Sequence, residues 1–213
     1  MNDSNQIIPK LDVPYYKETR YSTCGPAALM MVMKYWDNTI CLSKNLEYKI
    51  WLRCNPLIFL GGTLQFGLAR TAHKMGYKTK IYQKKRISEI NPHKGILYNF
   101  WSYIESRNIH RENITITYNV NIMDIIQESI MNKIPPIVFL NLKPLVGENV
   151  LHWLVVTGLD EKKIYVNDPY IPSNTNLKIK KGFPIKIAKF QESIATDKIG
   201  NLRLPPCLIQ IYR

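Results

Sequence analysis

The sequence contains few cysteines and histidines, and those it has are widely separated. The four cysteines, Cys24, Cys41, Cys54 and Cys207, include no C-x-x-C pair, which argues against a structural zinc site. They also do not resemble a disulfide framework, so we expect reduced thiols and a cytoplasmic protein. Because the four histidines show no metal-ligand spacing, we expect neither a metal ion nor another cofactor.

Long apolar segments are missing as well. No run approaches the ~20 apolar residues that a membrane-spanning helix requires, and the polar N-terminus carries no secretory signal pattern. There is also no Walker-type glycine-rich loop. We therefore expect a soluble domain without membrane-spanning or ATP-binding segments.

Acidic residues are scarce relative to basic ones. The chain has 29 Lys and Arg residues against 16 Asp and Glu residues, which gives a net charge of +13. Such an excess suits nucleic acid or an anionic surface, although it could equally reflect an AT-rich genome. The basic residues concentrate at 78–86 and 178–189, where they alternate with apolar residues. Since no nucleic-acid motif accompanies them, we favour a solvated face over a nucleic-acid site.

The pattern of helices and strands indicates one domain over 1–213, in which 1–12 can be an irregular lead-in. This length supports a well-buried core, and no repeat or linker divides it. Helical patterns cover 25–36, 43–54, 64–74, 96–107, 123–132 and 190–194. Strand patterns cover 77–83, 114–118, 137–142, 151–157, 164–167 and 207–212. Because helices precede a meander of strands, the order predicts an α+β fold.

Cys24 stands where a polar loop runs into an apolar helix. Ser22 and Thr23 are favourable N-cap residues, and Pro26 suits a first helical turn. Cys24 is therefore expected near free backbone N–H groups and the positive end of the helix dipole, which favour the nucleophilic thiolate. The alternative is a buried thiol that packs as a small hydrophobic residue.

His152 and Asp168 are the candidate partners of this thiol. His152 lies at the start of the strand pattern 151–157, and Asp168 follows the pattern 164–167. In an antiparallel hairpin these two positions become neighbours. A carboxylate bonded to Nδ1 of the imidazole would fix its tautomer and leave Nε2 to face the thiol. The alternatives are a core-edge histidine and a turn-forming Asp-Pro pair.

Three segments resemble the signature blocks of one peptidase family. They are Tyr-Ser-Thr-Cys-Gly-Pro-Ala-Ala-Leu-Met-Met-Val around Cys24, Leu-His-Trp-Leu-Val-Val-Thr-Gly around His152, and Ile-Tyr-Val-Asn-Asp-Pro-Tyr around Asp168. In this order and with these flanks the sequence resembles the double-glycine leader peptidases that process bacteriocins, family thirty-nine of the papain-like cysteine peptidases, and their stand-alone relatives. The resemblance runs from Val13 to Tyr170.

The resemblance implies a papain-like α+β fold, in which N-terminal helices pack on an antiparallel sheet. It implies Cys24 as nucleophile, His152 as general base and then acid, and Asp168 as the residue that orients the imidazole. One position departs from the family, which usually has a glutamine six residues before the cysteine as an oxyanion donor; this sequence has Glu18 there. An ionised carboxylate only accepts hydrogen bonds. Either Glu18 is protonated, another donor such as the Cys24 backbone N–H replaces it, or the enzyme is weakened.

The implied function is hydrolysis of an amide bond in a peptide or protein substrate by a catalytic triad. An acyl transferase would use the same chemistry if an amine replaced water. Two alternatives remain open: an inactive peptide-binding module on the same fold, and a basic binder of nucleic acid or acidic surfaces. The transporter segments to which the best-known family members are fused are not found here, so export of a leader peptide is not implied.

Overall fold

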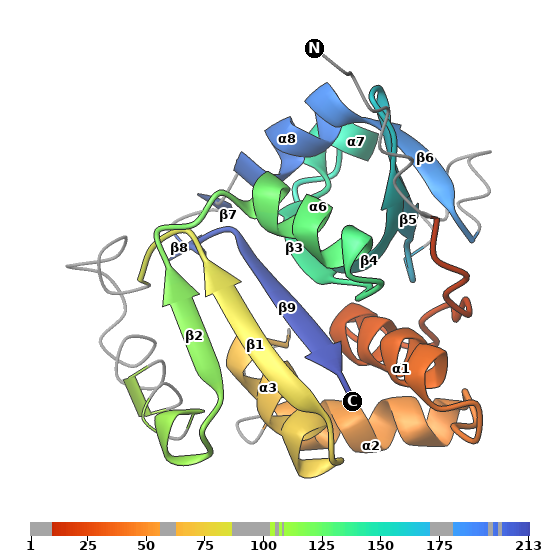
Figure 1. The fold of residues 1–213 in the computed structure, drawn as a ribbon, viewed down its shortest axis with the longest axis vertical. Helices are drawn as coiled ribbons and strands as arrows, with labels where there is room; N and C mark the ends of the chain where they lie inside the picture. The colour runs from red at the N-terminus through yellow and green to blue at the C-terminus, as the bar shows by residue number, and fades with distance from the viewer. Residues whose placement is uncertain are drawn as a thin grey trace.

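The computed structural model describes residues 10–55, 63–86, 103–104, 107, 109–170, 181–195, 198–199 and 202–213. Their main feature is a seven-stranded sheet in the order β2-β1-β9-β3-β4-β5-β6 (Figure 1). Its strands are β1 (Lys78–Gln83), β2 (Thr115–Tyr118), β3 (Ile137–Asn141), β4 (Leu151–Leu159), β5 (Lys163–Asn167), β6 (Phe183–Lys186) and β9 (Cys207–Tyr212). A separate ribbon consists of β7 (Lys198–Ile199) and β8 (Leu202–Arg203).

The direction of the strands agrees with the predicted α+β class except at one edge. Neighbouring strands of the large sheet are antiparallel, but β1 and β2 run parallel. The prediction of an antiparallel sheet therefore holds for the other strand pairs and is wrong only for β1 and β2. A parallel pair needs a long crossover instead of a tight turn, and the pattern of apolar residues in a strand does not reveal its direction.

The helices form two groups around this sheet. Those in the described residues are α1 (Cys24–Trp36), α2 (Lys44–Cys54), α3 (Gln65–Lys74), α6 (Ile122–Met131), α7 (Lys143–Val146) and α8 (Ile187–Ala195). The first three pack together, and α1 also lies against β4 (Figure 1). In contrast, α6 contacts β4, β1 and β9, and α8 contacts β3, β5 and β6.

The central helix of the first group is α1, and its burial explains its composition. All residues from Gly25 to Met33 are buried, as expected for a helix that is apolar nearly all round. Burial of one large side chain such as Leu29 contributes roughly 1.5–3 kcal/mol relative to exposure. The strands beside it, β3 and β4, are buried along almost their full length, which is typical of interior strands.

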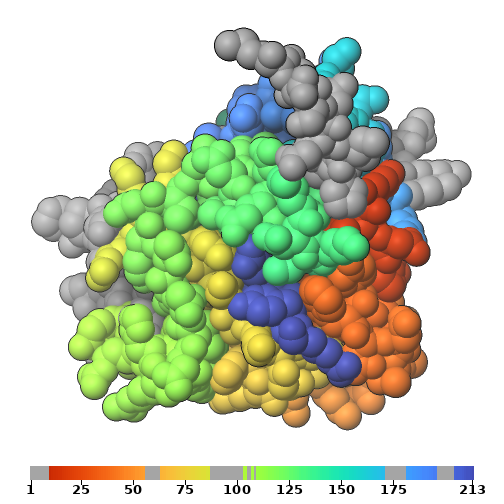
Figure 2. All heavy atoms as spheres, in the orientation of Figure 1, coloured from red at the N-terminus to blue at the C-terminus, as the bar shows by residue number. Residues whose placement is uncertain are grey.

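The C-terminal strand β9 occupies the middle of the sheet, between β1 and β3. Its end emerges at the surface beside the helices of the first group (Figure 2). There the guanidinium of Arg213 contacts the carboxylate of Asp37, directly after α1, at 2.5 Å. The indole of Trp36 donates to the carbonyl of Ile211 at 2.7 Å, so the end of α1 is tied to the end of the chain.

Most boundaries agree with the sequence predictions to within one residue. The helices expected over 25–36, 43–54 and 64–74 correspond to α1, α2 and α3. β4 and α8 extend two or more residues beyond their predicted bounds, since β4 continues to Leu159 and α8 begins at Ile187. Four elements were not predicted: α7, β6, β7 and β8. Of the helix expected over 96–107, only residues 103, 104 and 107 are described, and all three are helical. Most of the lead-in 1–12 lies outside the described residues.

Gly67 marks the closest approach of α3 to α2. A Cβ at this position would lie 2.4 Å from the carbonyl oxygen of Cys54. Alanine normally stabilises a helix relative to glycine by about 0.5–1 kcal/mol, but here the clash should dominate and cost about 1–3 kcal/mol. We expect Gly67→Ala to lower the free energy of unfolding in urea denaturation. A more stable variant would contradict this close contact of the two helices.

Candidate active site

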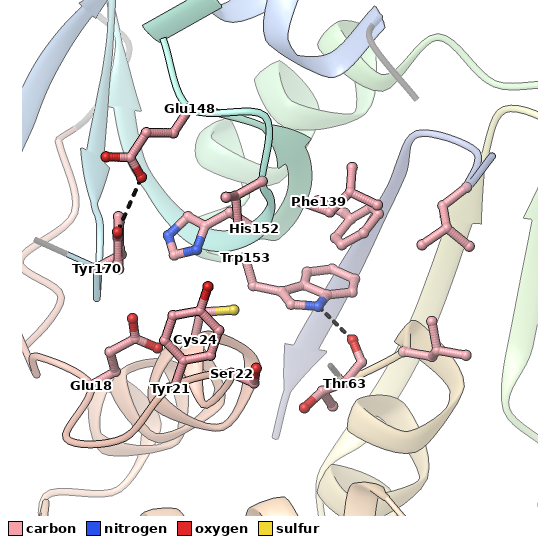
Figure 3. A pocket seen from close by; sticks show the side chains of 14 residues that line it. Glu18, Tyr21, Ser22, Cys24, Thr63, Phe139, Glu148, His152, Trp153 and Tyr170 are labelled. Carbon is pink, nitrogen blue, oxygen red and sulfur yellow. Dashed lines mark hydrogen bonds between the residues drawn. The ribbon is translucent and has the colours of Figure 1, made fainter. Parts of the chain in front are cut away.

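The fold brings the three predicted triad residues to one place. Cys24 is the first residue of α1, His152 is the second residue of β4, and Asp168 directly follows β5. Cys24 and His152 line a pocket of about 260 Å³, and Glu18 lies in its wall (Figure 3). They meet because α1 packs against β4.

The hairpin of β4 and β5 places Asp168 beside His152. Val155 pairs with Asn167 across the hairpin, so the residue after Asn167 lies close to the beginning of β4. Nε2 of His152 is 2.6 Å from Oδ1 of Asp168, and both side chains are buried. The predicted neighbourhood of these two residues therefore exists in the structure.

The two nitrogens of the imidazole have the opposite partners to those we predicted. Asp168 contacts Nε2, so Nδ1 is the ring nitrogen left to interact with Cys24, which lines the same pocket. Nδ1 is the ring nitrogen nearer to the backbone, and α1 packs against this strand. The sequence could not reveal this, because strand periodicity fixes the face of a side chain but not the rotation of its ring.

The surroundings of His152 favour its charged form. Burial lowers the pKa of the imidazole, but the negative charge of Asp168 and the interaction with Cys24 raise it more, and the pKa of His152 is well above the ordinary 6.5. A protonated imidazole beside a cysteine is the arrangement that stabilises a thiolate. The positive charge of His152 is therefore located in the pocket that Cys24 also lines.

A buried carboxylate from α2 holds the loop that precedes Cys24. Glu47 is 0% exposed and accepts a hydrogen bond from the Tyr16 hydroxyl at 3.0 Å and from the Thr19 N–H at 2.9 Å. The hydroxyls of Thr19 and Thr23 also donate to it, both at 2.5 Å. Four donors occupy all the acceptor positions of a carboxylate. The Glu47 carboxylate therefore fixes the path of the loop before Cys24.

The start of α1 is left without a side-chain cap. Thr23 occupies the N-cap position, as predicted, but its hydroxyl contacts Glu47 and the carbonyl of Arg20 rather than a helix N–H. Ser22, the other predicted cap, has a φ of +66° and lines the pocket. The first N–H groups of α1 are therefore available to a ligand next to Cys24.

Glu18 connects this loop to the chain that follows β5. Its backbone N–H donates to the carbonyl of Pro169 at 3.0 Å. Its side chain lies beside Cys24 in the pocket wall (Figure 3). The resemblance to a peptidase family places an oxyanion donor at this position, so the protonation of its carboxyl group matters for the chemistry.

The pKa of the Glu18 carboxyl group is raised from 4.5 to about 7. Burial is the largest cause, and the negative charges of Asp168 and Glu47 act in the same direction. The charge of His152 and a hydrogen bond from the Thr23 N–H lower it in part. Near pH 7 the group is therefore divided between the neutral acid and the carboxylate.

The remainder of the pocket is largely apolar. Trp153 is held by two contacts: its indole donates to the carbonyl of Thr63 at 2.7 Å, and its ring centroid lies 4.6 Å from that of Phe139. Gly25 permits this packing, since a Cβ there would lie 3.2 Å from Trp153. Further apolar lining comes from Leu64, Val150, Leu151 and Leu204.

Sequence reasoning missed two residues that support the site. Tyr170 donates its N–H to Oδ1 of Asp168 at 2.9 Å, and its hydroxyl donates to Glu148 at 3.1 Å. The contact between the Tyr170 N–H and Asp168 could have been predicted from the sequence, because Asp side chains in turns often accept from the N–H two residues later. No feature of the sequence indicated the role of Glu47, because its position on the predicted helix is also typical of a solvent-exposed glutamate.

Neither a metal site nor a membrane segment is found in the part of the chain that the structure describes. Its residues include no group of three His, Cys, Asp or Glu side chains that could hold a metal ion. None of its helices is both long and apolar enough to cross a bilayer.

Comparison with known proteins identifies the family. No curated protein matches the chain. Its fold is similar to that of a double glycine motif protease from an AMS/PCAT transporter, solved in complex with the leader peptide, at 17% identity, with 96% of this chain and 94% of that chain covered and a TM-score of 0.50. It is also similar to a C39-like peptidase from Bacillus anthracis at 14% identity, with 96% of this chain and 98% of that chain covered and a TM-score of 0.53.

These likenesses confirm the predicted papain-like α+β fold. A family model described as the Peptidase_C39 like family matches residues 13–200, which is most of the chain. This protein therefore belongs to the Peptidase_C39 like family.

Proposed function

We propose that this protein hydrolyses amide bonds in peptides, with Cys24 as nucleophile, His152 as general base and acid, and Asp168 as the group that orients the imidazole. The observation that carries the proposal is the arrangement of these three residues. Cys24 and His152 line one pocket, and Nε2 of His152 lies 2.6 Å from the buried carboxylate of Asp168. Membership of the family adds support.

The reaction follows from the positions of the groups. The Cys24 thiolate adds to the carbonyl carbon, and the carbonyl electron pair moves onto oxygen to give a tetrahedral oxyanion. As this collapses, the C–N bond breaks and the imidazolium of His152 gives its proton to the leaving amine. The resulting thioester is cleaved by water, whose proton returns to the imidazole, and the thiolate and imidazolium are restored.

Asp168 acts on His152 and not on the substrate. Its carboxylate accepts the Nε2–H and so keeps Nδ1 directed at the sulfur. Its negative charge also raises the pKa of the imidazole, which keeps the thiolate paired with a cation.

The pocket supports a peptide substrate with an apolar side chain close to the scissile bond. Its wall beside Cys24 consists mainly of apolar residues, with Trp153 and Phe139 fixed against each other. A structurally similar protease is described in complex with a leader peptide, which favours a peptide segment over a small amide.

Selective alkylation tests the proposed nucleophile. We expect limiting iodoacetamide at pH 6 to modify Cys24 at least about tenfold faster than Cys41, because an ordinary exposed thiol is mainly protonated there. Cys41 is exposed and so serves as the internal reference, whereas Cys54 and Cys207 are buried, and burial raises the pKa of both thiols.

Peptide mapping by mass spectrometry gives the four rates in one sample. The matched variant is His152→Ala, in which the rate at Cys24 should fall to that of Cys41 because the cation is lost. Equal rates at Cys24 and Cys41 in the native protein would refute the proposed thiolate.

The acid at position 18 favours one second candidate, a peptide-binding module that no longer hydrolyses its ligand. An ionised Glu18 would repel the oxyanion and could leave only binding. This reading predicts that native protein and the Cys24→Ala variant retain the same peptides with the same affinity and that neither releases a product.

A further inference from the structure

We propose that Glu18 acts as a catalytic residue in its neutral acid form, donating its carboxyl O–H to the oxyanion. This inference rests on the proposed function and adds a proton requirement to it. The active enzyme then carries protons on both Glu18 and His152, and deprotonation of Glu18 switches the oxyanion site from attractive to repulsive.

The position of the Glu18 carboxyl group supports this role. Its backbone is held by the carbonyl of Pro169, and one of its carboxyl oxygens accepts from the Thr23 N–H. The other oxygen, Oε2, is buried and has no hydrogen-bond partner among the described residues. Leaving a buried carboxylate oxygen unpaired is costly, whereas an O–H on the same atom has a use once an oxyanion forms beside Cys24.

The charges around Glu18 favour the neutral acid. It is faced by Glu47 from α2, by Asp168 after β5, and by one cation, His152 from β4. Cys24 at the start of α1 lines the same pocket, and its thiolate adds negative charge. Together with burial these groups raise the pKa of Glu18 to about 7.

Two tyrosines also face Glu18, and neither changes this balance near neutral pH. The pKa of Tyr15 is raised to about 12 by burial and by the charges of Asp168 and Glu18. Burial, the hydrogen bond to Glu148 and nearby charges that include Glu18 raise the pKa of Tyr170. Both hydroxyls are therefore neutral where Glu18 titrates.

The chemistry needs no net transfer of this proton. In the tetrahedral intermediate the O–H of Glu18 donates to the oxyanion, and the proton stays on Glu18 when the intermediate collapses. The amide N–H of a glutamine at position 18 would donate a hydrogen bond to the oxyanion at every pH, whereas an ionised Glu18 has no proton to donate. The predicted signature is an activity that is present below pH 7 and lost above it.

The test is the pH dependence of kcat/KM for native protein and Glu18→Gln, which reports the free enzyme. In native protein we expect kcat/KM to fall as the pH rises through about 7, which is the alkaline limb of the profile. In Glu18→Gln this alkaline limb should lie at a higher pH, where His152 loses its proton. At pH 9 only about one native molecule in 10² keeps the Glu18 proton, so Glu18→Gln should be about 10²-fold faster. Glu18→Ala should lose about 10²–10³-fold at pH 6.

Two further measurements make the result specific. Glu161→Gln, on the exposed turn between β4 and β5, removes the same charge and should keep the native limb. Carbon-13 NMR of glutamate-labelled protein should show one carboxyl group that titrates near pH 7 and disappears in Glu18→Gln.

The outcomes separate the two proposals. Equal alkaline limbs in native protein and Glu18→Gln, or a Glu18 titration near 4.5, would overturn this inference even in an active enzyme. If neither protein hydrolyses a peptide and Cys24 is alkylated no faster than Cys41, the proposed function falls and this inference falls with it.

Discussion

Replacing Cys24 by alanine is expected to abolish peptide hydrolysis, with kcat/KM lower by at least about 10⁴-fold, because no other group can form the thioester. The sulfur lies at the pocket and not in the core, so the folded state should persist. Hydrolysis of a quenched fluorescent peptide measures the rate, and thermal unfolding by circular dichroism measures the fold.

The matched control for this variant is Cys41→Ala, which removes an exposed thiol. It should keep the native rate. Hydrolysis that survives in Cys24→Ala at a tenth of the native rate or more would show that Cys24 is not the nucleophile.

Replacing Asp168 by alanine is expected to lower kcat/KM by about 10²–10⁴-fold, whereas Asp168→Asn should lose only about tenfold. Alanine leaves the buried Nε2–H of His152 without its acceptor and frees the ring to rotate. An asparagine carbonyl can still accept from Nε2, as in the Cys-His-Asn arrangement of papain-like proteases. It cannot supply the negative charge that raises the pKa of His152.

A pH profile shows in which direction the loss of the Asp168 charge shifts the pKa of His152. Because Asp168 raises the pKa of His152, its loss in Asp168→Asn should lower that pKa, and the imidazolium should lose its proton at a lower pH than in native protein. Alkylation of Cys24 by iodoacetamide reports this directly, since that reaction forms no oxyanion and does not need Glu18. An unchanged alkaline limb in Asp168→Asn would show that Asp168 does not set the charge of His152.

Much of the fold could be predicted from local patterns. The apolar run after Cys24 predicts α1 because a helix that is apolar on all sides must be buried, and its residues from Gly25 to Met33 are buried. The hairpin of β4 and β5 follows from two strand patterns and a short turn, and it brings His152 to Asp168. These features need only interactions between residues close in sequence.

The features that were wrong or missed depend on residues far apart in sequence. The parallel pairing of β1 with β2 depends on a long crossover, and the choice of Nε2 for Asp168 depends on how α1 meets β4. Glu47 became important only because its helix folds under the loop before Cys24. Charge pattern alone would have left it as a solvated side chain.

The sequence alone determined which chemical groups are present and which stretches become helices and strands, because these follow from side-chain chemistry and from periodicities of a few residues. Only the tertiary structure decided the protonation of Glu18, whose pKa of about 7 results from burial and from charges contributed by three separate elements. Electrostatic energy depends on distance in space and on exclusion of water, and neither exists until the chain has folded.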